Sequence, residues 1–125
     1  MTFDNKISII LPTLNEEKNL KILVPEISSL FENDLKLEYE IIVVDDGSTD
    51  STNEYISSLM KNNKSIKLIQ RDKEKSLPLS ILDGIKSSQF DNVMWLDADG
   101  SMTVKAMKKL VICYFTNIKN EEKKV

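Results

Sequence analysis

The stretch Trp95-Leu96-Asp97-Ala98-Asp99-Gly100 joins the end of an apolar segment to two acidic residues one position apart. In extended backbone, residues i and i+2 project to the same side of the chain. Asp97 and Asp99 can therefore direct two carboxylate oxygens to one point, and such oxygens are the ligands that Mg²⁺ and Mn²⁺ prefer. The stretch predicts a strand that ends in a divalent metal site shared with the phosphates of a substrate. A solvated turn is the simpler alternative for an isolated pair of acids.

A second acidic strand end favours the metal-site interpretation. Ile41-Ile42-Val43-Val44-Asp45-Asp46-Gly47-Ser48 again places acids directly after an apolar run. Together with two further β-branched runs, the predicted strands are Ile7–Leu11, Tyr39–Val44, Ile66–Gln70 and Val93–Leu96. Helical patterns alternate with these strands, which is typical of α/β crossover units and a parallel sheet. Because most of the runs are continuously apolar, we expect helices on both faces of the sheet.

Four helical patterns follow the four strands, and we expect the apolar residues of each pattern to lie in the core. These residues are Leu20, Leu23, Val24, Ile27, Leu30 and Phe31, then Tyr55, Ile56, Leu59 and Met60, then Leu79, Leu82 and Ile85, then Val104, Met107, Leu110, Val111 and Tyr114. Pro25 interrupts the first pattern, so that helix either kinks there or gives way to a second short helix. The second helix begins after a capping residue within 48–51, the third near Pro78 and the fourth near Thr103.

The composition narrows the classes of function. With 125 residues and a net charge of −3, the chain suits one domain and offers no basic surface for nucleic acid. It has no histidine, which excludes Ser-His and Cys-His nucleophiles and imidazole zinc sites. The single cysteine, Cys113, suits a reducing cytoplasm. No apolar stretch approaches the roughly 18 residues of a membrane span, and Met1–Lys6 does not resemble a signal peptide. We therefore expect a cytoplasmic protein with one domain over 1–115 and a charged, frayed tail over 116–125.

Three polar segments follow predicted strands and are expected to meet. In an open parallel sheet, ligands bind beyond the carboxyl ends of the strands, where the strand order reverses. For the order 3-2-1-4, this point lies between the first and fourth strands. The segments Pro12–Glu17, Asp45–Ser51 and Asp97–Ser101 would then border one cleft.

The order and spacing of three blocks resemble the nucleotide-binding half of family 2 glycosyltransferases, which have a Rossmann-like, GT-A type sheet. The blocks are residues 8–16, residues 43–50 and Leu96-Asp97-Ala98-Asp99. Within the family, the sequence is most similar to the polyprenol-phosphate mannosyl- and glucosyltransferases, whose metal motif also reads Asp-Ala-Asp. The resemblance implies a metal-dependent, inverting transfer of a hexose from a GDP or UDP donor. It also implies Mg²⁺ or Mn²⁺ as cofactor and a lipid phosphate acceptor at a membrane surface.

The same resemblance implies roles for individual residues. Pro12 and Thr13 would line the base and ribose pocket, Glu16 would reach the ribose or base, and Asn15 belongs to the same nucleotide-binding segment. Asp46 would contact the base, with Asp45 beside it, although both also suit a loop that caps a helix. Asp97 and Asp99 would hold the metal that bridges the diphosphate, with Ser101 as a weaker candidate ligand. Arg71 would face the nucleotide or a phosphate, unless it is exposed and pairs with Asp72 or Glu74.

The sequence departs from the family pattern at three places. Lys75-Ser76-Leu77-Pro78 replaces a glycine-bearing turn, Met102 stands where a histidine is common, and few residues follow Asp99. In the family, the catalytic base and the acceptor site lie beyond that point, and we identify no catalytic residue here. We therefore expect a donor-binding half, truncated after the metal motif, whose bare sheet edge favours self-association.

Two other functions fit part of the sequence. Asp97-Ala98-Asp99-Gly100-Ser101 also resembles the nucleophile loop of haloacid-dehalogenase-type phosphatases, with Asp97 as the nucleophile. That loop normally follows the first strand, whereas this one follows the fourth. A non-catalytic nucleotide-binding module is the other alternative. A dinucleotide-binding loop is disfavoured because no Gly-x-Gly-x-x-Gly pattern is present.

Overall fold

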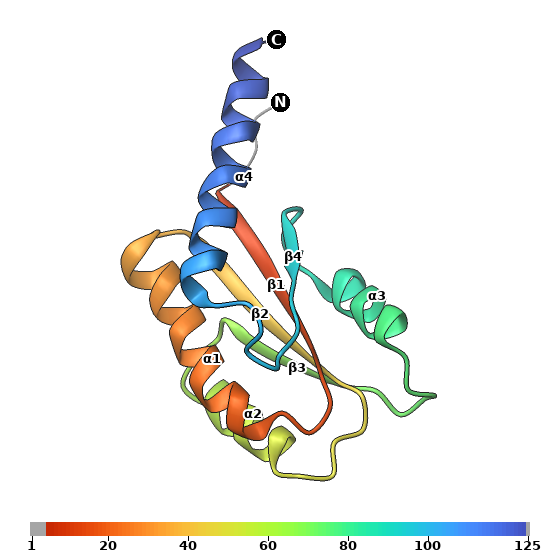
Figure 1. Cartoon of the computed structure of the whole chain (residues 1–125). Helices are drawn as coiled ribbons and strands as arrows, with labels where there is room; N and C mark the ends of the chain where they lie inside the picture. Colours follow the sequence, from red (N-terminus) through yellow and green to blue (C-terminus); the bar gives the residue numbers. More distant parts are fainter. Residues whose placement is uncertain (1–4, 125) are drawn as a thin grey trace.

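The computed structural model of the chain describes residues 5–124, with side chains described up to residue 121. These residues form a four-stranded sheet with the order β3-β2-β1-β4, in which all neighbours are parallel (Figure 1). The strands are β1 (Lys6–Thr13), β2 (Glu38–Asp45), β3 (Ile66–Gln70) and β4 (Val93–Trp95). The predicted fold class and strand order are therefore confirmed.

The central strands extend beyond their predicted ends. β1 and β2 pair in register along their whole length, from Lys6 opposite Glu38 to Thr13 opposite Asp45. The polar residues Thr13 and Asp45 thus belong to the strands, because ladder hydrogen bonds continue past the apolar runs. β4 ends one residue earlier than predicted, although the Leu96 amide still donates to the Ile10 carbonyl at 3.2 Å.

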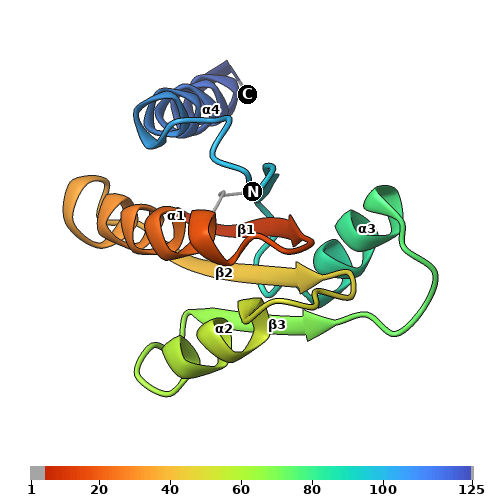
Figure 2. The same cartoon turned by 60° about the horizontal axis from the view of Figure 1, so that its bottom comes forward.

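The helices form two unequal layers (Figures 1 and 2). α1 (Glu17–Ser29) with its π-helical extension η1 (Leu30–Asp34), α2 (Thr52–Met60) and α4 (Val104–Lys124) cover one face of the sheet. Of the described helices, α3 (Leu77–Ser87) alone covers the other face, over β1 and β2. The main core lies on the first face, since alternate residues of β1 and β2 pack there against three helices.

Pro25 does not break the first helix. α1 continues through this residue to Ser29, and the helix changes type only at Leu30. A proline removes one hydrogen bond, here the one to the carbonyl of Lys21. Both Pro25 and Lys21 are exposed, so water can satisfy that carbonyl. The prediction of a second short helix that starts at Pro25 is therefore wrong, since the change of helix type comes five residues later.

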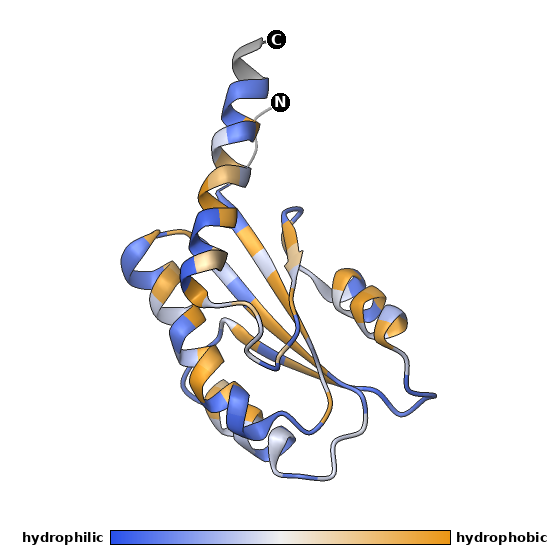
Figure 3. Cartoon of the chain, viewed as in Figure 1, coloured by the Kyte–Doolittle hydropathy of each residue, from blue (hydrophilic) through white to orange (hydrophobic). Residues whose placement is uncertain are grey.

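Several residues predicted to lie in the core are exposed. They are Met60 of α2, Leu79, Leu82 and Ile85 of α3, and Leu110 and Tyr114 of α4. On α3 the reason is the small residue Gly84, where a Cβ atom would lie 2.5 Å from Cγ2 of Ile10. The helix therefore rests on the sheet through Gly84 and the buried Ser80, while its larger apolar side chains are exposed. Figure 3 shows that hydrophobic residues make up much of α3.

α4 packs through a narrower stripe than its apolar pattern suggests. Met107, Val111 and Phe115 recur every fourth residue and are buried. Beyond Phe115 the helix continues to Lys124, so the charged segment 116–124 is helical and not a separate tail. Among the described helices, none has both the length and the apolar composition that crossing a membrane requires.

Candidate functional site

The carboxyl ends of β1, β2 and β4 lie at one edge of the sheet. The order β2-β1-β4 puts β1 between the other two strands, and all three run parallel. The Asp46 amide donates to the Thr13 carbonyl at 2.9 Å, which joins the β2 tip to β1. The tips of β2 and β4 are two inter-strand spacings apart, on the order of 10 Å. The fold thus brings the three polar segments to the same edge (Figure 1).

Asn15 connects two of these segments. It adopts a left-handed backbone conformation (φ 54°), which asparagine tolerates better than most residues. Its side-chain Oδ1 accepts hydrogen bonds from the Thr49 amide at 2.8 Å and the Asp50 amide at 3.2 Å, and its own amide donates to Ser48 Oγ at 2.8 Å. Asn15 therefore fixes the loop after β1 to the loop after β2.

The neighbours of Asn15 are also held within the chain. The buried Thr13 hydroxyl donates to the Leu11 carbonyl at 2.9 Å. The half-buried Glu16 accepts a hydrogen bond of 2.6 Å from Asn19 Nδ2. Pro12 is buried and, together with Thr13, lines a cleft at the end of the sheet.

Asp45 is almost completely buried, with 2 % of its surface exposed. Its Oδ2 accepts from the amides of Gly47 and Ser48, at 3.1 and 3.0 Å, and from Asn53 Nδ2 at 3.2 Å. Its Oδ1 accepts from the Ser48 hydroxyl. Both carboxylate oxygens are thus used by the loop itself, and this geometry makes Asp45 a residue that shapes the loop.

Asp46 points into a different environment, a cleft of about 310 Å³. The lining side chains come from the β1 end, the β2 end and the start of α3: Pro12, Thr13, Leu14, Asp46, Lys75, Ser76, Leu77 and Ser80. Asp46 Oδ2 accepts from the Ser76 amide at 2.8 Å, and Oδ1 pairs with Nη1 of Arg71. We call this cleft with Asp45, Asp46 and Arg71 the base end of the site, after the role that the resemblance implies.

The side chain of Arg71 is buried, which rules out the alternative of an exposed pair with Asp72 or Glu74. Its side chain is 3 % exposed, and its acidic partners are Asp46 and Asp83, the latter at 2.9 Å from Nε. Its contact with Glu74 is a hydrogen bond that Nη1 donates to the Glu74 backbone carbonyl at 3.2 Å. The hydrogen bonds to Asp83 and Asp46 raise the pKa of Arg71, so the guanidinium stays charged. Sequence reasoning missed Asp83 because the pair joins β3 to α3.

The second part of the site, which we call the metal end, comprises Asp97, Asp99 and Ser101. Asp97 and Asp99 are exposed, and the residue between them, Ala98, is buried in the main core. Asp99 Oδ1 accepts from the Ser101 amide at 2.9 Å. Hydrogen bonds from the side chain and the backbone of Ser101 lower the pKa of Asp99, so this carboxylate is ionised at neutral pH.

These residues fit a divalent cation that is shared with a ligand. Two exposed carboxylates supply hard oxygen atoms, which Mg²⁺ and Mn²⁺ prefer. Within residues 5–121, no group of three or more His, Cys, Asp or Glu side chains is arranged to hold a metal. Two carboxylates alone leave most of the coordination to water and phosphate, which is how Mg²⁺ is usually bound beside phosphate substrates.

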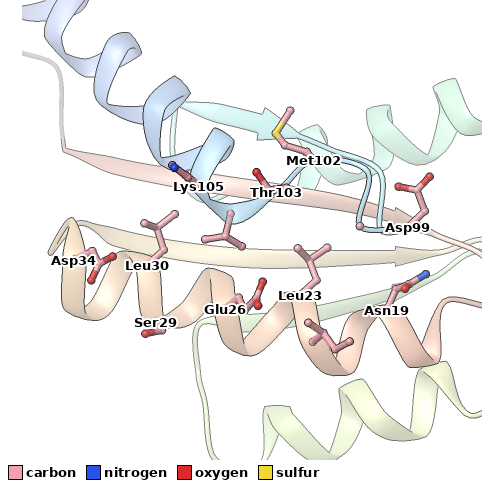
Figure 4. Close-up of a pocket in the computed structure, with 13 residues that line it drawn as sticks. Asn19, Leu23, Glu26, Ser29, Leu30, Asp34, Asp99, Met102, Thr103 and Lys105 are labelled. Atoms are coloured by element: carbon pink, nitrogen blue, oxygen red, sulfur yellow. The ribbon is translucent and has the colours of Figure 1, made fainter.

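A larger cleft of about 690 Å³ begins beside the metal end. It runs between α1 and the segment that leads from Asp99 into α4, with Asp99 at one end and Asp34 at the other (Figure 4). Both polar and apolar side chains line it, including Glu26, Leu23 and Lys105. The site edge is therefore open on the α1 side as well as at the base end.

Comparisons with known proteins match most of the chain. The model of glycosyl transferase family 2 matches residues 8–112. A dolichol-phosphate mannosyltransferase of Pyrococcus furiosus is 37% identical over 106 residues, which are 85% of this chain and 29% of that protein. The human dolichyl-phosphate beta-glucosyltransferase is 32% identical over 111 residues, which are 84% of this chain and 34% of that protein. The chain thus spans about a third of the length of these curated relatives.

Solved structures show the same fold. Residues 1–349 of Staphylococcus aureus TarS in complex with UDP superpose with a TM-score of 0.64 at 28% identity, over 75% of this chain and 27% of that chain. The mannosyltransferase PcManGT of Pyrobaculum calidifontis, in complex with GDP-Man and Mn²⁺, gives a TM-score of 0.65 at 20% identity, over 79% of this chain and 30% of that chain. None of these matches supports the phosphatase interpretation.

Proposed function

Because this chain belongs to glycosyl transferase family 2, we propose that it forms the donor-binding part of a metal-dependent glycosyltransferase that uses a nucleotide-sugar. One observation carries the proposal. A cleft lined by Asp46 and a pair of exposed carboxylates lie at the same sheet edge, on either side of the β1 end. A nucleoside diphosphate has a base at one end and phosphates at the other, so it can reach both.

At the base end, we assign contact with the nucleotide to Asp46, Pro12 and Thr13, which line the cleft, while the buried Arg71 holds Asp46 in place. Carboxylate oxygens accept hydrogen bonds from base N–H groups or ribose hydroxyls. Both oxygens of Asp46 already accept a hydrogen bond from the protein, which fixes the carboxylate while leaving further lone pairs for a ligand.

Behind these residues, Asp45, Asn15 and Glu16 hold the loops in place. Their hydrogen bonds run within the chain, so their contribution to nucleotide binding is to position the loops that carry Asp46 and Thr13. The resemblance implies direct contact with the nucleotide for these three residues, and we propose this positioning role in its place.

At the metal end, Asp97 and Asp99 would hold Mg²⁺ or Mn²⁺, with Ser101 keeping Asp99 in position. The Mn²⁺ present with GDP-Man in PcManGT supports this choice of cofactor. When bound, the metal would supply a Lewis acid that stabilises negative charge on the departing diphosphate.

For the acceptor, we propose a lipid phosphate at a membrane surface. The support is the pair of relatives named for dolichol phosphate and dolichyl phosphate. Among the described residues we identify no catalytic base, so the positioning of the acceptor is outside this proposal. The single cysteine supports a location in the reducing cytoplasm. The absence of histidine supports chemistry that depends on carboxylates and a metal ion.

We also propose that a second copy of the chain binds at the β4 edge. In the described sheet β4 has a neighbour on one side only, and its Trp95 is 46 % exposed. On the face of the sheet that α4 covers, an apolar groove of about 230 Å³ lies between β4 and α4 and is lined by Met94, Leu110 and Tyr114. Apolar side chains on both sides of an unpaired strand favour edge-to-edge pairing. Light scattering of the parent chain and Trp95→Lys tests this, since an unchanged monomer in both would contradict it.

Calorimetric titration tests the main proposal. GDP and UDP are titrated into the chain with and without Mn²⁺, and the titrations are repeated with the Asp97→Ala/Asp99→Ala variant. We expect one nucleotide to bind, Mn²⁺ to strengthen its binding, and the double substitution to remove this enhancement. Absence of nucleotide binding would contradict the proposal. Nucleotide binding that Mn²⁺ does not strengthen would favour the non-catalytic nucleotide-binding module.

A further inference from the structure

One carboxylate beside the base end has no role in the proposed function. Asp83 lies on α3 and accepts a hydrogen bond of 2.9 Å from Nε of Arg71. We propose that Asp83 is a positioning residue for nucleotide binding, which acts through Arg71 on Asp46. This inference rests on the proposed function, because it assumes that Asp46 faces the nucleotide.

The shape of the guanidinium makes the connection direct. A guanidinium is planar and rigid, so the direction of its Nε–H bond determines where its Nη atoms lie. In Arg71, Nε points to Asp83 on α3, while Nη1 pairs with Asp46 Oδ1 and approaches the Glu74 carbonyl at 3.2 Å. Without Asp83, rotation about the last side-chain bonds of Arg71 would no longer be restrained at Nε. The position of Nη1 against Asp46 would then vary.

α3 restrains Asp46 by two routes. The first is direct, from the amide of Ser76, which is the N-cap residue of α3, to Asp46 Oδ2. The second runs from Asp83, about two turns further along the helix, through Arg71 to Asp46 Oδ1. Each oxygen of Asp46 is thus fixed by a different part of the same helix. Preorganisation of this kind lowers the entropy lost when a ligand binds.

Burial separates this role from a purely structural one. Arg71 is 3 % exposed and Asp46 12 %, whereas Asp83 is 41 % exposed. A partly exposed ion pair adds little to folding stability. Removal of Asp83 also leaves Arg71 with its buried partner Asp46, so the charge in the cleft remains compensated. Substitution of Asp83 should therefore change nucleotide affinity more than stability.

The test compares three variants by calorimetric titration of GDP and UDP in the presence of Mn²⁺. We expect Asp83→Ala to raise the Kd of the bound nucleotide about tenfold, the scale of one lost charge-assisted hydrogen bond. Asp83→Asn keeps an oxygen that can accept from Nε, so its Kd should stay within about threefold of the parent value. Asp72→Ala is the matched control, because Asp72 is an exposed acid next to Arg71 in sequence and should leave the Kd unchanged.

Two further measurements separate the positioning role of Asp83 from a structural one. The ratio of the Kd values without and with Mn²⁺ should be the same in Asp83→Ala as in the parent, since Asp83 acts at the base end. The thermal midpoint of Asp83→Ala should stay close to that of the parent. Equal nucleotide affinity in Asp83→Ala and the parent would overturn the inference alone, as would an affinity loss that Asp83→Asn does not reverse. If the parent binds neither GDP nor UDP, the proposed function fails and this inference fails with it.

Discussion

The base end and the metal end of the candidate site are built in opposite ways. At the base end, Asp45, Asp46 and Arg71 are buried or nearly so, and each makes several hydrogen bonds to the chain. At the metal end, Asp97 and Asp99 are exposed, and Asp99 accepts a hydrogen bond from the nearby Ser101 amide. Folding therefore shapes the base end, whereas a bound cation and ligand must complete the metal end. Substitutions at the two ends should therefore affect different measurements.

The largest effect on stability is expected at Asp45. Asp45→Ala leaves the Gly47 amide, the Ser48 amide and the Ser48 hydroxyl without their buried, charged acceptor. We expect a loss of about 3 kcal/mol in the free energy of unfolding, measured by urea denaturation. Asp45→Asn retains one acceptor oxygen and should lose roughly half as much. Equal stability of Asp45→Ala and the parent would show that the base end is not preformed.

A smaller loss is expected where α3 touches the sheet. Gly84→Ala places a Cβ atom 2.5 Å from Cγ2 of Ile10, so the helix must move away. Overpacking of this kind costs about 1–3 kcal/mol, again measured by urea denaturation. Because α3 carries Ser76 and Asp83, nucleotide affinity should fall as well, while the ratio of affinities with and without Mn²⁺ stays constant. A change in that ratio would mean that the two ends are coupled through α3.

The loop connection at Asn15 offers a finer test of the base end. Asn15→Gly keeps the left-handed backbone but removes the acceptor for the Thr49 and Asp50 amides, and we expect a loss of about 1 kcal/mol. Asn15→Ala adds the strain of a left-handed alanine, about 1 kcal/mol more. Chemical denaturation of both variants separates the two contributions. If the alanine and glycine variants are equally stable, residue 15 does not adopt the left-handed conformation described above.

The smallest effect on stability is expected at the metal end. The double substitution Asp97→Ala/Asp99→Ala removes two exposed carboxylates that make few contacts, so the urea midpoint should not change measurably. The same variant should nevertheless lose all enhancement of nucleotide binding by Mn²⁺. A marked loss of stability would erase the contrast between the two ends.

Much of this architecture could be predicted from the sequence, and the reasons are physical. The strands are continuous, β-branched runs, which are typical of a sheet covered on both faces, so their positions could be predicted. Their alternation with helical patterns predicted that they run parallel. The acids after β2 and β4 met at one edge because parallel strands end on the same side. The family membership rests on these same blocks, and the match over residues 8–112 confirms it.

The side-chain environments were harder to predict. The different roles of Asp45 and Asp46 could have been found, since adjacent residues at a strand end point to opposite faces. The outward turn of Leu79, Leu82 and Ile85 could not, because spacing alone does not distinguish a helix that packs through large residues from one that packs through Gly84. The pairing of Arg71 with Asp83 depends on where α3 lies on the sheet, which no local pattern encodes.

The connection made by Asn15 has a consequence for hydrogen exchange. The amides of Thr49 and Asp50 belong to an exposed loop, where solvent exchange is usually fast, yet both donate to a side chain from the preceding β–α connection. These two amides should exchange together, at a rate set by the opening of both loops as one unit. Hydrogen exchange at these two amides would thereby measure how often the loop after β1 and the loop after β2 open together.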